Sequence, residues 1–485
     1  MNRTSVNWRK PIIMGLLRAQ RSPVLRELKF VRSIERRTPE EILRISNERL
    51  SRLLIHAWTN TDYYHELLSD CGVVRDGKVD LDRFEDVPFL TKRIIQQDAG
   101  RLRAGSLPKG RKAYVNRTGG STGEPVEYWQ DSHYEAVNVA DKLYHFETMG
   151  KEPGQRELKI WGAERDIFRD TSGLKVKLKN FIYNRSVKPC GSLSTDDIQG
   201  IIEHINRKKP RLIWAYIDSA YAVASYAERN GLKLHSPAAV FCGGGTMFPD
   251  MEASIQRAFQ APAINFYGSR EMGDVACECS EKQGLHVASH SHVVEVLDEN
   301  ARPVMEQEGE LVITSLMNYA MPFIRYRIGD RGALTARRCA CGRGFPLLDS
   351  VSGRSIESFV TASGNLVSPI YLITSIGAAL NPGLVRKFQL VQDDYSHVTL
   401  KLVPESGHEE GELTSILRQV TEKIRGVMGQ DCVVDHRFVR DIPRQKSGKY
   451  LYTISNVAGN GYSWRGGEGE SRDVQELAAV VENVQ

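Results

Sequence analysis

The sequence lacks any long hydrophobic run. No apolar stretch approaches the roughly 18 residues that a membrane-spanning helix needs, which excludes an integral membrane protein. Cysteine is also scarce, since 8 cysteines in 485 residues are too few for a disulfide scaffold. Neither sign of charge dominates, because 65 Lys and Arg stand against 60 Asp and Glu. The net charge of +5 gives no general indication of nucleic-acid binding.

What the sequence contains is an ordinary globular composition. Hydrophobic residues make up 41% and charged residues 26%, and the chain is long enough to bury a sizeable core. Its length indicates about three domains, or one large domain with a smaller partner.

Positive charge is concentrated near the N-terminus. Residues 1–37 hold ten basic and two acidic residues, so this segment carries +8 and the other 448 residues sum to −3. Its apolar stretch at 11–17 is short for a signal peptide, and Arg18 and Arg21 follow where a cleavage site would stand, so we expect no secretion signal. The segment is either a solvated helix packed on the body, or a basic arm that contacts an anionic membrane or an acidic partner.

Apolar spacing predicts an α/β body. Residues 40–70 and 130–149 have helical spacing. Short apolar runs then alternate with helical stretches, which predicts a parallel sheet of βαβ units. The expected strands are 158–161, 212–216, 238–241 and 263–267, and the expected helices are 197–207, 218–230 and 249–259.

The pattern changes after residue 287. Residues 293–297 and 309–314 read as antiparallel strands, and a smaller α+β unit follows residue 353, with a helix at 411–428 and a strand at 432–439. We therefore expect four parts: a basic N-terminal arm at 1–40, an N-terminal domain at 41–353, a C-terminal mobile domain at 354–459 and a flexible tail at 460–485.

A glycine- and hydroxyl-rich segment is a candidate anion-binding loop. Such a loop can turn successive N–H groups toward phosphate oxygens, although a plain surface turn has the same composition. The Gly-x-Ser-x-Gly spacing also fits a hydrolase nucleophile elbow, but an elbow needs a helix next, whereas here Pro125 intervenes and 126–129 alternates like a strand. The pattern favours a hairpin over phosphates. The loop residues are Thr118, Gly119, Gly120, Ser121, Thr122 and Gly123.

Four cysteines cluster in the sequence. Cys279 and His286 are seven residues apart, and Cys339 and Cys341 follow, which gives three thiolates and an imidazole suited to a structural zinc ion. Alternatives remain open: Cys277 rivals Cys279, His290 and His292 rival His286, and the thiols could be free. The scattered cysteines read as buried hydrophobes in a reducing cytoplasm; they are Cys71, Cys190, Cys242 and Cys432.

Five segments, in order, resemble those of the adenylate-forming superfamily of acyl-CoA synthetases and adenylation domains. Three further segments resemble the phenylacetate–CoA ligase family and its relatives in capsular polysaccharide biosynthesis. The resemblance covers roughly residues 45–455. The superfamily segments are 118–125, 266–271, 325–330, 353–354 and 443–449, and the family segments are 54–64, 88–92 and 339–343.

The resemblance implies a fold and an activity. The fold would be a large α/β N-terminal adenylation domain and a small mobile α+β C-terminal domain. The activity would use ATP and Mg²⁺ to convert a carboxylic acid, with aryl acids among the candidates, into acyl-AMP, and would pass the acyl group to coenzyme A. Two alternatives are an adenylating enzyme with an amine or sugar acceptor in surface-polysaccharide synthesis, and a degenerate nucleotide-binding protein.

The resemblance also implies roles for single residues. Loop 118–123 would hold the β- and γ-phosphates, and the Glu271 carboxylate would bind Mg²⁺, a hard cation. Tyr267 would stack on adenine, and Asp330 would accept from the ribose hydroxyls. Ordinary roles compete: Asp330 could cap a turn, Glu271 could stand in the first turn of a helix, and Tyr267 is common at a strand end. Also implied are Gly243, Gly244 and Gly268 near adenine, Arg354 near the ribose or phosphates, and Lys449 between carboxylate and α-phosphate.

Three positions depart from the family pattern. Gly245 stands where a Glu is frequent, Ser355 follows the hinge where an Asp is usual, and Glu124 lies near the loop end where a Lys is frequent. A carboxylate beside a triphosphate is unfavourable unless it points away. The acyl pocket is expected to involve Trp161, Gly162, Trp214, Tyr216 and Ser269, although the aromatic residues among them could equally fill a core.

Overall fold

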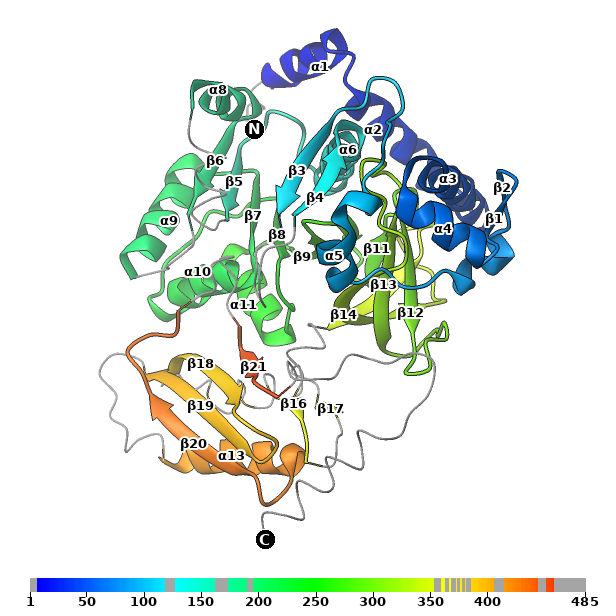
Figure 1. Cartoon of the computed structure of the whole chain (residues 1–485). Coiled ribbons are helices and arrows are strands. Elements are labelled where there is room, and N and C mark those ends of the chain that lie inside the picture. Colours follow the sequence, from blue (N-terminus) through cyan, green and yellow to red (C-terminus); the bar gives the residue numbers. More distant parts are fainter. Residues whose placement is uncertain are drawn as a thin grey trace.

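A computed structural model gives the fold (Figure 1). It describes residues 7–117, 127–161, 173–189, 195–352, 359–362, 366–367, 372, 376, 380, 385–404, 414–443 and 451–457. Among these residues no helix combines the length and the apolar character needed to cross a membrane.

The N-terminal hundred residues are mainly helical. The predicted helix at 40–70 is divided at Thr61, whose hydroxyl accepts a hydrogen bond from the backbone N–H of Tyr64 (3.1 Å) and caps the second helix. The first of the two begins with a capping box formed by Thr38 and Glu41. The elements are α1 (Arg9–Ala19), α2 (Pro23–Ile34), α3 (Pro39–Asn60), α4 (Asp62–Asp70), β1 (Val74–Arg75), β2 (Lys78–Val79), the 3-10 helix η1 (Leu81–Asp86) and α5 (Lys92–Leu102).

The two helices of the N-terminal arm pack on the body. The inner faces of α1 and α2 share a core with α6 (Ser132–Thr148), as expected for helices that cover a hydrophobic surface. Polar contacts add to this packing: Lys10 pairs with Glu152 (2.7 Å), and Arg32 pairs with Glu147.

A large mixed sheet forms the body. Its order is β12-β13-β14-β15-β11-β10-β9-β8-β7-β5-β6, and the five strands from β6 to β9 are parallel. The predicted βαβ alternation is confirmed. The parallel half comprises β5 (Glu157–Ile160), α8 (Leu174–Tyr183), β6 (Arg185–Lys188), α9 (Thr195–Lys208), β7 (Leu212–Tyr216), α10 (Ile217–Arg229), β8 (Ala239–Gly243), α11 (Pro249–Phe259) and β9 (Ala263–Ser269).

The remaining strands of this sheet are antiparallel, as predicted for 293–297 and 309–314, whereas the earlier strands β10 and β11 were not predicted. They are β10 (Gly273–Glu278), β11 (Leu285–Val287), β12 (His292–Leu297), β13 (Gly309–Ser315), β14 (Tyr326–Thr335) and β15 (Leu347–Ser352).

A buried ion cluster lies at the start of β5. The Glu157 carboxylate pairs with both Lys151 and Arg185. Burial alone would raise the pKa of Glu157, but Arg185 and Lys151 together lower it to about 2. This carboxylate therefore stays ionised inside the folded protein at neutral pH.

The glycine-rich segment is bracketed by two paired strands. β3 (Ala113–Arg117) and β4 (Glu127–Asp131) form an antiparallel pair in which Arg117 stands opposite Glu127. A strand therefore follows the segment, as the alternation at 126–129 predicted, and not the helix of a nucleophile elbow. Residues 118–126 themselves lie outside the described residues.

A second, smaller sheet belongs to the C-terminal part (Figure 1). Its order is β20-β19-β18-β21, and α13 contributes four buried side chains to its core. Its elements are β18 (Val385–Gln392), β19 (His397–Pro404), α13 (Thr414–Met428), β20 (Val433–Phe438) and β21 (Thr453–Ser455), and β16 (Phe359–Val360) and β17 (Leu366–Val367) form a separate antiparallel pair. The expected α/β body followed by an α+β unit is thus observed.

Candidate active site and metal centre

Two glycines at the end of β8 bring backbone close to aromatic rings. A Cβ on Gly243 would lie 2.5 Å from the Phe266 ring, and one on Gly244 would lie 2.5 Å from the Tyr216 ring. Gly244 also has φ +77°, a backbone conformation that favours glycine. At Gly245 the nearest atom, the Ile217 Cδ1, would be 4.0 Å away, so its missing side chain is not imposed by packing.

The next strand carries Tyr267, which meets Asp330 from β14. The Tyr267 hydroxyl donates to the Asp330 Oδ2 over 2.8 Å, although the two residues are 63 positions apart. Asp330 lies within a strand and is not a turn cap. The structure therefore brings together two of the predicted nucleotide-binding residues, at the carboxyl end of the parallel strands where open α/β sheets bind ligands.

Glu271 stands in the hairpin turn between β9 and β10. The alternative that placed it in the first turn of a helix is wrong, because the chain reverses here and Gly273 pairs with Ser269. The Ser269 hydroxyl accepts from the backbone N–H of Met272 (3.1 Å), and a Cβ on Gly268 would collide with the carbonyl of Gly273. This tight turn has no space for side chains at its glycines.

Two side chains that sequence reasoning missed hold the tip of this hairpin. The buried Gln130 amide donates to the carbonyl oxygens of Arg270 (2.9 Å) and Glu271 (3.3 Å). The Tyr134 hydroxyl donates to the same two oxygens, at 3.4 and 3.1 Å. Gln130 also accepts from Asn116 (3.1 Å) on β3. It therefore connects the strands that bracket segment 118–126 with the backbone of Glu271.

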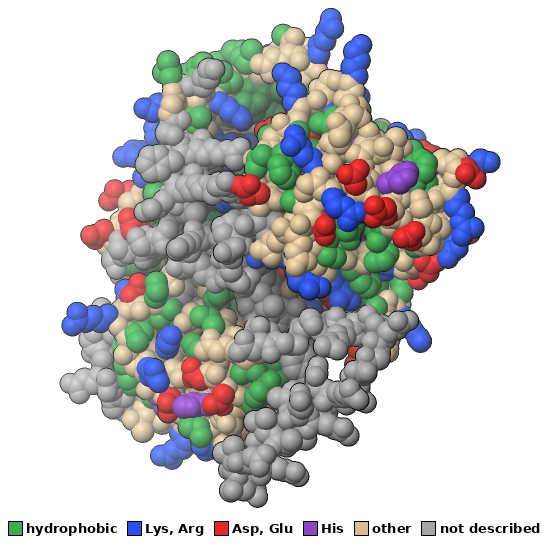
Figure 2. Space-filling view, viewed as in Figure 1, with side chains coloured by type: hydrophobic (Ala, Val, Ile, Leu, Met, Phe, Trp, Pro, Cys, Tyr) green, Lys and Arg blue, Asp and Glu red, His purple; other side chains and the backbone are tan. Residues whose placement is uncertain are grey.

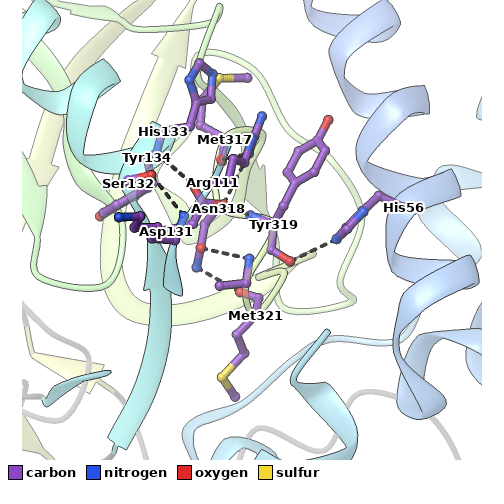
Figure 3. A network of polar contacts seen from close by, with 12 residues as sticks. His56, Arg111, Asp131, Ser132, His133, Tyr134, Met317, Asn318, Tyr319 and Met321 are labelled. Carbon is purple, nitrogen blue, oxygen red and sulfur yellow. Dashed lines mark hydrogen bonds and ion pairs between the residues drawn. The ribbon is translucent and has the colours of Figure 1, made fainter. Parts of the chain in front are cut away.

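A polar network anchors the other end of β4 (Figure 3). The buried Asp131 carboxylate accepts from the backbone N–H groups of His133 (2.8 Å) and Tyr319 (2.8 Å) and from Arg111 (3.1 Å). Arg111 lies over the Tyr319 ring at 4.1 Å, and His56 contacts the Tyr319 carbonyl at 2.9 Å. The network fixes the connection between β13 and β14, and so the approach to Asp330.

Two of the segments that carried the family resemblance meet in space. Leu90 and Arg325 share a backbone hydrogen bond of 3.0 Å, and the Arg327 N–H donates to the Leu90 carbonyl (2.9 Å). The buried Arg325 guanidinium pairs with Glu295 (2.8 Å) and lies over the Phe89 ring at 4.5 Å. Arg325 thus has a packing role that joins residues 88–92 to the sheet.

The aromatic residues predicted for the acyl pocket form one cluster. The Trp161 ring stacks on Tyr216 at 3.9 Å between centroids and lies 5.1 Å from Trp214. Phe266 completes the cluster, 6.3 Å from Trp161. These rings contact one another as core residues do, so their part in binding an acid stays a prediction.

Several predicted site residues fall outside the described residues. They are Thr118, Gly119, Gly120, Ser121, Thr122 and Gly123 of the loop, Gly162 of the predicted acyl pocket, Arg354 and Ser355 of the hinge, and Lys449 of the C-terminal loop.

The second site is a cluster of three cysteines and one histidine. Cys279 follows β10, His286 lies on β11, and Cys339 and Cys341 stand in the turn between β14 and β15; their ligand atoms all lie within 4.8 Å of one another. The Cys279 and Cys339 sulfurs are 3.5 Å apart, and the Cys341 sulfur lies 3.3 Å from the His286 Nε2. Tetrahedral zinc at about 2.3 Å from sulfur and about 2.0 Å from nitrogen requires separations of roughly 3.5–3.8 Å, so this donor set fits.

The rival ligands have other partners. The fully buried Cys277 donates to the Glu278 carbonyl (3.4 Å), His290 pairs with Asp141 (2.8 Å), and His292 contacts the Met272 carbonyl (2.7 Å). Among the scattered cysteines, Cys242 and Cys432 are buried as predicted, whereas Cys71 is only half-buried. Cys190 lies outside the described residues.

Local electrostatics suit a metal centre. Burial, aided by Arg343, lowers the pKa of His286 to about 4, so the imidazole is neutral at pH 7 and can act as a ligand. Burial raises the pKa of Cys279 to about 12. Burial acts in the same direction on Cys341, but hydrogen bonds from the Arg343 backbone and from neighbouring side chains together lower the pKa of this thiol. Bound metal would supply the positive charge that the buried thiolates need.

The N-terminal arm braces this centre. Arg36 donates to the Cys341 carbonyl (3.1 Å), and Arg343 pairs with Glu35 (3.1 Å). The Gly344 N–H donates to the Glu35 carbonyl over 2.9 Å. The end of α2 thus holds the cysteine turn in place.

Comparison with known proteins is consistent with this geometry. A solved 2-hydroxyisobutyryl-CoA ligase in the postadenylation state matches over 93% of each chain, with a TM-score of 0.68 at 19% identity. The fold is therefore that of the adenylate-forming CoA ligases.

Proteins with similar sequences indicate which adenylate-forming ligases this chain resembles. Residues 359–456 match the CapK C-terminal domain. Protein CapK of Staphylococcus aureus is 22% identical over 86% of this chain and 90% of its own length, and phenylacetate–coenzyme A ligase of Thermus thermophilus is 25% identical over 73% and 79%. The chain is a relative of phenylacetate–CoA ligases and of CapK, which confirms the resemblance drawn from the sequence segments.

Proposed function

We propose that the protein activates a carboxylic acid with ATP to give acyl-AMP and pyrophosphate, and then transfers the acyl group to coenzyme A. The observation that carries this proposal is the Tyr267–Asp330 hydrogen bond of 2.8 Å, beside the side-chain-free backbone at Gly243 and Gly244. A flat aromatic ring, close backbone and an oriented carboxylate suit a nucleoside. The relatives named as phenylacetate–CoA ligases support the acid and the thiol acceptor.

Each described residue has a part in this proposal. Tyr267 stacks on adenine while its hydroxyl holds Asp330, whose carboxylate accepts from the ribose hydroxyls. Glu271 supplies a carboxylate oxygen to Mg²⁺, and its backbone is held by Gln130 and Tyr134. Mg²⁺ neutralises phosphate charge when bound. Gln130 connects the backbone of Glu271 to β3 and β4, the strands on either side of the phosphate loop.

The remaining roles rest on the family resemblance. Loop 118–123 holds the β- and γ-phosphates, and Arg354 reaches the ribose or phosphate region. Lys449 bridges the carboxylate and the α-phosphate, where negative charge grows in the transition state. The C-terminal domain, proposed as residues 354–459, delivers this lysine by rotation.

The lysine gives a sharp test. Lys449→Ala should slow acyl-AMP formation about 10²-fold or more, the scale of losing one oxyanion donor. Conversion of supplied acyl-AMP to thioester should continue, because the lysine is rotated away for that step. Lys446→Ala in the same loop is the matched control and should stay near normal. Equal slowing of both half-reactions, or of neither, would contradict domain rotation.

The acid and the acceptor are found with a substrate panel. Pyrophosphate release is measured with a panel of carboxylic acids, including aryl acids, with and without coenzyme A. Acid-dependent AMP formation distinguishes an enzyme from a degenerate nucleotide-binding protein, which Gly245 and Glu124 would suit. Absence of acid-dependent turnover across the panel, with ATP still bound, would favour the binding protein.

A second candidate has an amine or a sugar as the acyl acceptor. Its support is the match to CapK over 86% of this chain and to the CapK C-terminal domain, neither of which identifies an acceptor. Acyl-AMP formation that coenzyme A does not consume, but an amine or sugar does, would select this candidate.

We also propose that the Cys279–His286–Cys339–Cys341 cluster binds one structural zinc ion. Four protein ligands would close the site, so the metal would support folding and not turnover. The described cysteines form no disulfide, and unpaired thiols persist in a reducing compartment, so we place the protein in the cytoplasm.

A further inference from the structure

Two helices expose apolar side chains on their outer faces. Six of the twelve exposed large hydrophobic residues among the described ones lie on α1, including its N-cap, and on α8. They follow helical spacing, i, i+4, i+8 on α1 and i, i+4, i+7 on α8. Their exposed fractions run from 42% at Leu16 to 85% at Leu174. This α1–α8 face comprises Trp8, Ile12, Leu16, Leu174, Leu178 and Phe181.

The two stripes form one surface. The helices contact each other, and the Arg9 guanidinium lies over both the Trp8 ring (4.3 Å) and the Phe181 ring (5.2 Å). Arg9 also donates to the Phe181 carbonyl over 3.3 Å. In Figure 1 both helices lie at the end of the molecule opposite the C-terminal sheet, and Figure 2 shows hydrophobic atoms gathered at that end.

The exposed stripes are not needed for attaching the helices to the body. Ile13 and Leu17 of α1 are buried in the core shared with α6, and Ile182 and Tyr183 of α8 pack against the same core. On α1 the exposed stripe is therefore a second apolar stripe in addition to the buried one, and on α8 it is separate from the half-buried Ile182 and Tyr183. A helix that is apolar on two faces normally has a partner on both.

The charge on these helices indicates which partner. Together α1 and α8 contain six Lys and Arg and no Asp or Glu. Arg18, Lys177 and Lys179 are exposed beside the apolar stripes. A second copy of this chain, docked by the same face, would bring two such positive surfaces together, which is unfavourable. An anionic lipid surface offers negative headgroups around an apolar layer and matches both properties.

We infer that the α1–α8 face docks on the surface of an anionic lipid bilayer. Trp8 and Phe181 enter the boundary between headgroups and acyl chains, where aromatic rings are favoured, and the leucines reach below them. The exposed Lys and Arg contact the lipid phosphates. The protein binds as a peripheral protein, with the C-terminal sheet directed away from the lipid. This inference does not depend on the proposed ligase activity.

Vesicle flotation of the full chain tests it. Vesicles of equal parts phosphatidylglycerol and phosphatidylcholine should bind the protein at least tenfold more tightly than phosphatidylcholine alone. Binding should weaken as salt rises from about 0.05 to about 0.5 M, because salt screens exposed charges. The triple variant Leu174→Gln/Leu178→Gln/Phe181→Gln should lose at least tenfold in affinity. Lys177→Glu/Lys179→Glu should remove the preference for anionic lipid.

A matched control keeps the test specific. Leu232→Gln/Met305→Gln replaces two similarly exposed apolar residues elsewhere and should bind vesicles as the unchanged protein does. Because all these positions are exposed, thermal unfolding should be nearly the same for every variant. Light scattering after size exclusion is measured in parallel. Equal binding to both vesicle types, no loss in the triple variant, or a dimer that this variant dissociates in place of vesicle binding would overturn the inference.

Discussion

Removing both donors that hold the hairpin tip should cost more than the sum of the single losses. Gln130 and Tyr134 donate to the same two carbonyls, those of Arg270 and Glu271, at distances of 2.9 to 3.4 Å. Gln130→Leu or Tyr134→Phe alone leaves each carbonyl with one partner, so each should cost about 1 kcal/mol of unfolding free energy. The double variant leaves the carbonyls of two half-buried residues without either donor, at up to about 2 kcal/mol each.

The expected double loss is therefore about 4 kcal/mol against a sum of about 2, a coupling of about 2 kcal/mol. Urea unfolding of the large domain measures it. Acyl-AMP formation should fall more steeply in the double variant, since the Glu271 carboxylate is positioned by this backbone. The affinity for ATP should change less than the rate, which distinguishes positioning from loss of the fold.

A surface pair supplies the control for this cycle. The Gln199 amide donates to the Tyr226 hydroxyl over 2.6 Å at an exposed position. Gln199→Leu and Tyr226→Phe should each change stability by less than about 0.5 kcal/mol and should be additive. The idea that Gln130 and Tyr134 together hold the hairpin tip is refuted if their stability losses are as additive as those of this surface pair and acyl-AMP formation is unchanged.

Three further outcomes are expected. Freshly purified, reduced protein should carry one zinc per chain by elemental analysis. Cys339→Ser should lose most of this zinc together with several degrees of thermal stability, and an unchanged zinc content in this variant would contradict the assignment. Gly244→Ala should fold poorly because of its positive φ and the nearby ring, whereas Gly245→Ala should melt as the unchanged protein does. The pKa of Glu157 is about 2 in the fold against 4.5 for the free side chain. The stability that this carboxylate contributes is therefore complete above about pH 4.5, and roughly 3 kcal/mol should be lost as the pH falls toward 2. Urea unfolding at a series of pH values measures this loss, and Glu157→Gln should flatten this part of the profile.

Much of the fold follows from local patterns. Apolar runs separated by helical stretches predicted β7, β8 and β9 and the helices between them within a few residues, because buried parallel strands and amphipathic helices have distinct periods. The strand after Pro125 was predicted in the same way and excluded the nucleophile elbow. The division at Thr61 was missed, because one capping hydroxyl interrupts a continuous apolar pattern.

The sequence alone predicted the chemistry of a site only where the residue types themselves indicate the ligand. Three cysteines and a histidine indicate zinc from composition and order, but the choice of Cys279 over Cys277 and of His286 over His290 needed distances across three strands. Gln130 gave no signal, because a buried amide in a strand has no pattern of its own. Its role depends on a hairpin 140 residues away.

The tertiary structure decided which apolar side chains of α1 and α8 are buried and which are exposed. In a sequence, an apolar stripe at helical spacing predicts burial, since that is where such stripes usually lie. Here α1 buries one stripe on the body and α8 half-buries Ile182 and Tyr183, while other apolar side chains of both helices remain exposed among basic side chains. Whether a side chain is exposed depends on which other parts of the protein pack against it. The spacing of apolar residues along one helix does not specify those packing partners.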